Sequence, residues 1–499
     1  MRNSLCSVLG VVMGAVFALP AAEAPVVLSA ADCGFAPDAE AAQNVAALQK
    51  ALDGGKKTVT VARPGEYRLN ARVYIDSDTR LVFAPGVILK KTGRYDFVLV
   101  NRGALTRTWN ENIAIEGLTI CVNGVDVCPS TDQPVFGLRG HLTMYFVRNL
   151  TVTRFTCLDV QKNQFCLHFC KFDHLVLDTF EIRGDKDGVH LGTGKNFVVR
   201  NGVCATYDDG VALNAQDYPS SQPMQGDITD GVVENVADLR KEKTGGNSVR
   251  LLTGAWPDWR MGLLLRNGDT VRHGKNVYRV LSKEVGKDVA SAEAPVHAQG
   301  AWTDKAGLTF YHSQSDGAVQ ANIRNVVFKK LQLQESRNSF KASWDFCSAN
   351  RAIHPATPKE RIPVMDVTVM DTRASGPKPF VYGNASIHAR LDDVACEGPL
   401  FSIKGKDTDC SLTAKGWQVA KAVGETSEPD ILFEGPGVLN LSLEGVKQGR
   451  DVRLKIGKNT RTRVTGSVSV DTLDNLSPVK GDTVRVGGIK KAFSGGAWE

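Results

Sequence analysis

The chain has 499 residues, a formal net charge of +6 and a hydrophobic content of 42%. This composition excludes a disulfide-held miniprotein and a disordered chain. A charge this small for the length does not favour a nucleic-acid-binding protein. Part of the positive excess is local, since residues 441–499 hold 11 Lys and Arg against 6 Asp and Glu. We interpret this excess as a solvated face rather than a binding patch.

The N-terminus has the features of a secretory signal peptide. Arg2 precedes an apolar run from Leu5 to Leu19, and small residues follow up to Ala24; this order is typical of export signals. The run is shorter than the roughly 20 residues that a membrane-spanning helix needs. We therefore expect a signal peptide over residues 1–24, no membrane span, and a monomeric protein that is secreted or periplasmic.

Ten cysteines remain after the signal peptide. An even number in an exported protein allows disulfides, and Cys121 with Cys128 and Cys166 with Cys170 are the closest pairs. Most of the cysteines lie in apolar runs, however, where a free cysteine packs as a small hydrophobe, so both outcomes stay open. Because no C-x-x-C pair occurs, we expect no metal site, and no other cofactor is indicated.

Residues 37–53 are the best predicted helix. Val45, Leu48 and Leu52 share one helix face, and Gly54 ends the pattern. This helix precedes a long series of short β runs, whose open end needs a cover against edge pairing. We expect the helix to be that cap.

A repeat follows the helix. A polar or glycine residue, an alternating apolar run and a second short strand recur, with aligned starts at residues 150, 175 and 197. Repeats of roughly 20–30 residues with short strands are typical of β-solenoids, in which each turn buries its apolar side on the next. We predict an all-β fold, a right-handed parallel β-helix, with its coils in residues 25–256 and 316–499.

Residues 257–315 interrupt this repeat. Their aromatic spacing and the absence of a coil pattern predict a small β module inserted in a loop. Trp302 and Tyr278 could bind a sugar there, but we favour a packing role for the module. Because it follows Arg250 closely, we expect it to wall one end of a nearby cleft, which favours exo action or short substrates.

Two adjacent coils carry nearly the same phrase, with Asp187-Gly188 in one and Asp208-Asp209-Gly210 in the other. Asp187 and Asp209 are one coil apart and should stack at about 4.8 Å between strands. Like charges this close raise the pKa of at least one carboxyl group, which gives the protonated acid and ionised base that glycosidic cleavage requires. Asp-Gly is also a common turn dipeptide, so a structural role stays the alternative.

The register extends to neighbouring positions if Val211 lies opposite Val249. Two columns of aligned residues then result. The first contains Phe165, Asp187, Asp209 and Asn247, and the second contains His168, His190, Ala212 and Arg250. Arginine binds carboxylates in a bidentate manner. We therefore predict substrate-binding roles for Arg250, Asn247, His190 and His168, with packing as an equal alternative for the two histidines.

These residues carry a resemblance to a known family. Asp185-Lys186-Asp187-Gly188 is similar to the N-T-D-G motif, and Asp208-Asp209-Gly210 to the D-D motif, of the polygalacturonase family of glycoside hydrolases (family 28) in the pectin-lyase-like β-helix superfamily. Residues 62–67 and 83–86 resemble the first coils of that superfamily. The resemblance covers roughly residues 30–255. It implies that Asp208 is the general acid and that Asp187 and Asp209 activate water in an inverting hydrolysis.

Two family motifs differ in this chain. The G-H-G segment is absent, and Gly245-Gly246-Asn247-Ser248 is the nearest phrase. The R-I-K segment is matched only by Arg250-Leu251-Leu252, without the lysine that helps to bind a galacturonate carboxylate. A pectin-like glycan and a related neutral or sulfated glycan are therefore both open as substrates.

Three hypotheses follow. The first is an exported glycoside hydrolase that uses the three aspartates. The second is a polysaccharide lyase, in which Asp187 and Asp209 could hold Ca²⁺. The third is a non-catalytic glycan-binding β-helix. In each of them the partner is a polysaccharide or oligosaccharide, and no nucleic acid is expected.

Overall fold

The structure is a computed structural model. It describes residues 26–130, 133–239, 245–313, 317–334, 337–347, 350–405, 407–419, 429–445, 452–456, 460–465, 468–470, 483–486, 489–492, 494–497 and 499. The predicted signal peptide, residues 1–24, lies outside the described residues.

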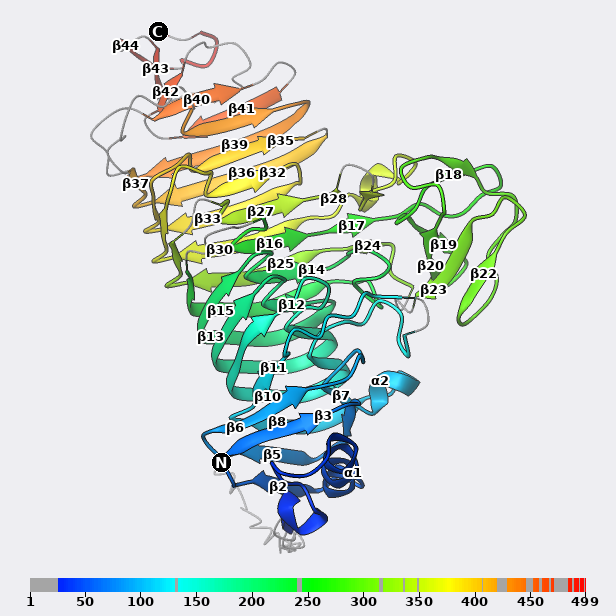
Figure 1. The fold of residues 1–499 in the computed structure, drawn as a ribbon. Coiled ribbons are helices and arrows are strands. Elements are labelled where there is room, and N and C mark those ends of the chain that lie inside the picture. The colour runs from blue at the N-terminus through cyan, green and yellow to red at the C-terminus, as the bar shows by residue number, and fades with distance from the viewer. Residues whose placement is uncertain are drawn as a thin grey trace, which may run out of the picture.

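The chain forms a right-handed parallel β-helix, in which successive coils stack along one axis (Figure 1). Strands β10 (Leu142–Val160), β11 (Leu167–Gly184) and β13 (Gly194–Thr206) pair in parallel. The predicted repeat is confirmed, since Leu150, Leu175 and Phe197 are register partners on these strands. All three are buried, so each coil adds one apolar side chain to a continuous interior stack.

The polar residue before each apolar run marks a bend. Asn149, His174 and Asn196 have φ angles of 53°, 60° and 58°, in the left-handed region that asparagine tolerates better than most residues. Asn149 also donates to Asn112 on the preceding coil at 2.9 Å. The recurrent polar position therefore turns the chain between two faces of the coil.

Helix α1 (Ala41–Leu52) covers the N-terminal end of the coils. It is shorter than the predicted 37–53, because Glu40 is the N-cap and forms a capping box with Gln43. Leu48 and Leu52 are fully buried and belong to the main core. The predicted capping helix is thus present, with a later start.

One face of the solenoid carries the short strands that matter for the site. They follow one another coil by coil and pair in parallel. They are β12 (Val189–Leu191), β14 (Val211–Asn214), β16 (Val249–Leu252), β27 (Phe340–Ser343), β32 (Val381–Gly383), β35 (Phe401–Lys404) and β38 (Ile431–Glu434).

A second face is formed by longer strands of the same coils, which pair in the same order. They are β15 (Ile228–Asp238), β25 (Ile323–Lys329), β30 (Met365–Met370), β33 (Ile387–Asp392), β36 (Thr408–Lys415) and β39 (Gly437–Glu444).

A small β module projects from the side of the solenoid (Figure 1). Its antiparallel sheet consists of β19 (Thr270–His273), β20 (Asn276–Leu281), β22 (Ala301–Thr303) and β23 (Thr309–Ser313). Tyr278 is fully buried in a separate apolar core, and Trp302 packs against that core. This burial fits the packing role that we favoured for the two aromatic residues.

Most of the cysteines that the structure describes are buried and pack as small core residues. Those with described side chains have free thiols and form no disulfide with one another. Burial raises the pKa of the Cys170 and Cys396 thiols to about 12, so they stay protonated. Among the described residues, no helix is both long and apolar enough to cross a bilayer.

Candidate functional site

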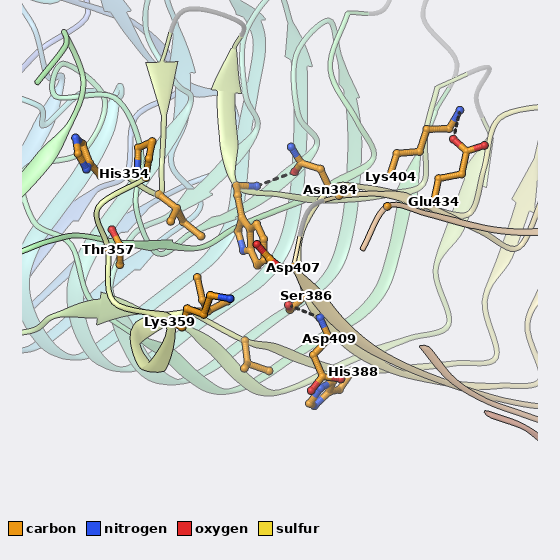
Figure 2. Close-up of a pocket in the computed structure, with 17 residues that line it drawn as sticks. His354, Thr357, Lys359, Asn384, Ser386, His388, Lys404, Asp407, Asp409 and Glu434 are labelled. Carbon is orange, nitrogen blue, oxygen red and sulfur yellow. Dashed lines mark hydrogen bonds and ion pairs between the residues drawn. The ribbon is translucent and has the colours of Figure 1, made fainter. Parts of the chain in front are cut away.

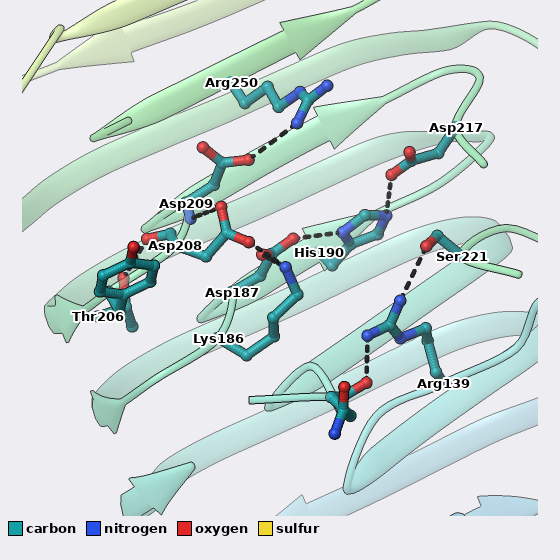
Figure 3. Close-up of polar contacts among 12 residues, drawn as sticks. Arg139, Lys186, Asp187, His190, Thr206, Asp208, Asp209, Asp217, Ser221 and Arg250 are labelled. Carbon is teal, nitrogen blue, oxygen red and sulfur yellow. Dashed lines mark hydrogen bonds and ion pairs between the residues drawn. The ribbon is translucent and has the colours of Figure 1, made fainter. Parts of the chain in front are cut away.

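Two hollows lie along the face formed by β12, β14, β16, β27 and the following strands. The larger, of about 1090 Å³, lies at the C-terminal ends of β27, β32, β35 and β38 (Figure 2). The smaller, of about 360 Å³, lies at the N-terminal ends of β12, β14 and β16 (Figure 3). The smaller one contains the predicted aspartates.

The predicted register is confirmed around the smaller pocket. His168, His190, Ala212 and Arg250 are successive register partners. The N–H of Gly188 donates to the Asp209 carbonyl, and the N–H of Gly210 donates to the Asn247 carbonyl. Five of the seven predicted site residues line the pocket, namely Asp187, Asp208, Asp209, Asn247 and Arg250.

The three aspartates converge in this pocket. One carboxylate oxygen from each of Asp187, Asp208 and Asp209 lies within 4.8 Å of the others. Asp187 and Asp209 are 3% and 1% exposed, whereas Asp208 is only partly buried. The cluster therefore has two carboxylates in its floor and one nearer to solvent.

Asp209 is held by residues of the next coil. The backbone N–H and the side-chain Nδ2 of Asn247 both donate to its Oδ1 at 2.8 Å. The Nη1 of Arg250 lies 3.6 Å from its Oδ2. Because both oxygens have partners, the orientation of this carboxylate is determined by the neighbouring coil.

Asp187 is held by a buried histidine. The Nδ1 of His190 lies 2.9 Å from its Oδ2, and the Nε2 of His190 lies 3.6 Å from an oxygen of Asp217. The imidazole stacks on Phe165 with ring centres 4.0 Å apart. Burial alone would raise the pKa of Asp187, but the positive charge of Lys186 and the hydrogen bond with His190 outweigh it and hold this pKa well below its usual range.

Asp208 has the opposite character. Burial and then the negative charges of Asp187 and Asp209 raise its pKa to about 7, although the ammonium of Lys186 opposes the shift. Lys186 forms an ion pair with Asp208, and its Nζ lies 3.6 Å from Asp187 (Figure 3). At pH values below about 7 these shifts favour a protonated Asp208, whose contact with Lys186 is then a hydrogen bond rather than an ion pair, beside an ionised Asp187.

The same three carboxylates have the donor atoms that a divalent cation prefers. However, the Lys186 ammonium already lies against two of them. A cation bound there would have to displace this lysine. The arrangement therefore favours proton transfer over metal binding.

Gly245 and Gly246 pass close to the aspartates. Their N–H groups donate to the Tyr207 carbonyl, and a Cβ on Gly246 would lie 2.5 Å from the backbone of both Asp208 and Asp209. Only glycine allows this approach. The segment that we compared with the G-H-G motif therefore forms part of the pocket wall.

The structure places the two histidines behind the pocket rather than in it. His168 and His190 are both 0% exposed, and neither lines the pocket. The Nδ1 of His168 contacts the backbone of Arg139, and burial holds its pKa well below the usual value. The burial of both histidines fits the packing alternative that we predicted for them. His190 contacts Asp187 through its Nδ1.

Several pocket residues were missed by the sequence analysis. Lys341 is the register partner of Arg250 on β27 and lines the pocket. A lysine therefore does lie beside Arg250, but it comes from the next coil rather than from the Arg250-Leu251-Leu252 segment. Arg139 also lines the pocket; it donates to Ser221 at 2.9 Å and lies over the Phe165 ring at 4.3 Å. The long insertion before Lys341 prevented its register from being counted.

A buried ion pair supports the Asp208 turn from beneath. The guanidinium of Arg337 pairs with Asp238 and donates to the Asp208 carbonyl at 2.8 Å. Ser248 donates to the same Asp238 carboxylate. Three consecutive coils are thereby tied to the backbone of the candidate acid.

The inserted module supports one wall of the pocket without entering it. No described residue between 257 and 313 lines the pocket. Arg279, which is 2% exposed, donates to the carbonyl of Asp217, and Thr270 accepts from Gln216 at 2.9 Å. Since Asp217, Tyr218 and Ser221 line the pocket, the module holds the loop that carries them.

We compared the chain with known proteins. No family model matches it, and the search of curated proteins finds no match. Among solved structures, it is similar to a family 28 exopolygalacturonase from Yersinia enterocolitica, with 12% identity, 88% of this chain and 78% of that chain covered, and a TM-score of 0.43. An exopolygalacturonase from Thermotoga maritima matches with 11% identity over 95% of each chain and a TM-score of 0.44. A tailspike protein of Escherichia coli phage HK620 matches with 10% identity over 92% of this chain and 78% of that chain, and a TM-score of 0.46.

Proposed function

We propose that the chain is a glycoside hydrolase that cleaves a polysaccharide or oligosaccharide. The observation that carries this proposal is the convergence of Asp187, Asp208 and Asp209 in one pocket. Burial and the neighbouring negative charges there raise the pKa of Asp208 to about 7, whereas Lys186 and His190 hold the pKa of Asp187 low. Paired carboxyl groups in different protonation states are what glycosidic hydrolysis needs. An exported protein, as residues 1–24 predict, would meet such substrates outside the cell.

The roles follow from these protonation states. Asp208 donates its proton to the glycosidic oxygen as the bond to the anomeric carbon breaks. Asp187 and Asp209 remain acceptors; one of them takes a proton from a water molecule whose oxygen attacks the anomeric carbon from the opposite face. The products are two shortened glycans; the base then releases to solvent the proton that it took from water, and Asp208 takes up a proton from solvent.

Inversion is the stereochemistry that the resemblance to family 28 implies. The three carboxylate oxygens lie within 4.8 Å of one another, which is nearer to the roughly 5–5.5 Å of retaining pairs than to the roughly 6.5–9.5 Å of most inverting pairs. An inverting reaction at this site therefore needs the attacking water to bind beside Asp187 and Asp209 rather than between the acid and a distant base. Proton NMR of the first product formed distinguishes the two outcomes, since a retained anomer would assign a nucleophilic role to one of these carboxylates.

The pocket suits an acidic or highly hydroxylated sugar. Arg139, Arg250 and Lys341 line it together with the aspartates. Guanidinium groups bind carboxylates and vicinal oxygens through several donors. A glycan that contains a uronic acid is the first substrate to test. The R-I-K segment lacks its lysine in this chain, but Lys341 on β27 places a lysine beside Arg250.

The test is a digestion of a glycan panel by the wild-type protein and by Asp208→Asn. We expect new reducing ends from at least one glycan. In the variant, kcat should fall by roughly a thousandfold, while the affinity for glycan stays within a few-fold. Products with a new ultraviolet absorbance would assign a lyase instead. Binding without turnover on every glycan would favour a non-catalytic β-helix.

A lyase is the second candidate, because the three carboxylates could hold Ca²⁺. It makes a separate prediction. A calcium-dependent lyase loses activity in EDTA and regains it with added Ca²⁺. The hydrolase that we propose keeps its activity in both conditions, because its proton transfers need no cation.

A further inference from the structure

The larger groove, of about 1090 Å³, is not explained by the proposed function. We propose that it is a second, non-catalytic glycan-binding site, which holds uncharged sugar residues of the same chain whose scissile bond lies in the aspartate pocket. The inference rests on the proposed function, since it assumes that a glycan occupies that pocket.

The groove has two walls of different origin. The turns after β27, β32, β35 and β38 form one wall, with Trp344, Asn384, Gly405 and Gly435 at equivalent places. The segment from 353 to 364 forms the other and leaves the solenoid to do so. A groove bounded by an extra segment is a more specific shape than the gap between two ordinary turns.

The chemistry of the walls suits a sugar without charge. Trp344 lines the groove while part of its ring packs against the main core, and its buried indole Nε1 finds no hydrogen-bond partner among the described residues. Figure 2 shows polar side chains around the groove, which include two lysines and three acidic residues. They are Lys359, Lys404, Asp407, Asp409 and Glu434.

This balance of charge argues against a polyanion. Lys404 is already paired with Glu434 at 3.3 Å, so the groove offers no surplus of positive charge. Sugar rings combine apolar C–H faces with hydroxyl groups that both donate and accept. An aromatic face with donors and acceptors around it is the pattern of a ligand site with those properties.

The groove and the aspartate pocket are linked by β27. Lys341, near the start of this strand, lines the pocket, and Trp344, the residue directly after its end, lines the groove. Three residues of a strand span roughly 10 Å. A glycan of a few residues is long enough to occupy both, and a shorter one is not.

This geometry predicts a dependence on chain length. Contacts made far from the reacting bond, and equally in the ground and transition states, change KM more than kcat. Trp344→Ala should raise KM for long oligosaccharides by about tenfold. KM for the shortest oligosaccharide that the protein cleaves should stay unchanged. Trp344→Phe, which keeps a ring but loses the indole N–H, should have a smaller effect.

A surface variant provides a second measurement that does not depend on core packing. Lys359 is exposed and its substitution by alanine should raise KM for long chains by a few-fold. Lys305→Ala is the matched control, because Lys305 lies on the inserted module outside both hollows. If these variants change KM equally for short and long chains, or for none, the groove is not a glycan site.

Binding to the inactive protein separates this inference from the proposed function. Asp208→Asn, with and without Trp344→Ala, is run in affinity gels that contain neutral galactan, neutral dextran or polygalacturonate. Retardation in a neutral gel that Trp344→Ala weakens about tenfold supports the groove, even if no glycan is ever hydrolysed. Equal retardation of both proteins in every gel overturns the groove, even if hydrolysis is found.

Discussion

Asn247 donates two hydrogen bonds, from its backbone N–H and its Nδ2, to the same oxygen of Asp209, both at 2.8 Å. The two residues are 38 positions apart in sequence and one coil apart in the structure. Two donors on one oxygen fix the direction in which the carboxylate points. One coil thus determines the orientation of a catalytic candidate on the coil before it.

Asn247→Ala removes one of these donors and keeps the backbone one. We expect kcat to fall by roughly tenfold to a hundredfold, because Asp209 would rotate away from the attacking water. Asn247→Asp should lower kcat further, since it places a second negative charge against Asp209. Steady-state kinetics on the best glycan of the panel check this. Equal kcat for wild type and Asn247→Asp would exclude a role for Asp209 as water-activating base.

The pH dependence of kcat follows from the two shifted carboxyl groups. Asp208 must be protonated to donate, and its pKa is raised to about 7, so activity should decline as the pH rises through about 7. Asp187 must be ionised, and its pKa is held well below the usual range, so no decline is expected on the acid side down to about pH 4. Activity that still increases between pH 7 and 9 would contradict the assignment of Asp208 as the acid.

Lys186 controls the position of this profile. Its positive charge lowers the pKa of both Asp187 and Asp208. Lys186→Met therefore raises both values and should move the basic limb of the profile to higher pH, with the acid limb moving in the same direction. Lys195→Met is a suitable control, because Lys195 is exposed, pairs with Asp173 and lies outside this pocket. A basic limb that stays in place would show that the group titrating there is not Asp208.

The part of the site that lies within uninterrupted coils was predictable from the sequence. Asp187 and Asp209 are separated by one coil without an insertion, so their spacing alone predicts that they stack, and the match of Val211 with Val249 is enough to add Asn247 and Arg250. The exposure of a residue in such a column was not predictable. His190 is buried because the loop that follows β14, on the next coil, covers it, with Asp217 facing its Nε2.

Residues brought in by loops could not be found in this way. Arg139 enters the pocket from the segment before β10, and Lys341 lies beyond the inserted module, 91 positions after Arg250. Neither position follows from a period. The inserted module itself was recognised by the loss of the coil pattern, but its contact with the pocket wall depends on Arg279, which no motif marks.

Arg279 is expected to affect catalysis through the loop that it holds. Its guanidinium donates to the carbonyl of Asp217, and burial lowers its pKa to about 9. Arg279→Met loses these hydrogen bonds but also removes a buried charge, so the two effects on stability oppose each other. We expect the Tm to change by only a few degrees and kcat to fall about tenfold. Arg260→Met, an exposed arginine of the same module, is the control and should change neither.

The contradicting outcome for Arg279 is equally specific. If Arg279→Met lowers the Tm strongly and the protein that remains folded keeps its full kcat, the module contributes stability but does not position the pocket wall. Measuring the pH profile in the same variant strengthens the test. A displaced Asp217 changes the surroundings of His190 and therefore of Asp187, which a merely structural role would leave unchanged.

Asp208→Asn should stabilise the protein at alkaline pH. The folded-state pKa of Asp208 is raised to about 7, whereas an unfolded aspartate titrates near 3.9. Between these values the folded state binds a proton that the unfolded state lacks, so the stability that Asp208 contributes is complete below about pH 4 and is lost as the pH rises through about 7. The asparagine variant has no such loss. Its Tm should therefore exceed that of the wild type at pH 8 and approach it at pH 4.

Asp230→Asn is the control, and its Tm should be lower than that of the wild type at pH 8. Hydrogen bonds with Asn325 and Thr229 lower the pKa of Asp230, so the stabilising effect of this carboxylate is present at high pH. A lower Tm for Asp208→Asn than for wild type at pH 8 would mean that Asp208 is an ordinary ionised partner of Lys186 and not a proton donor.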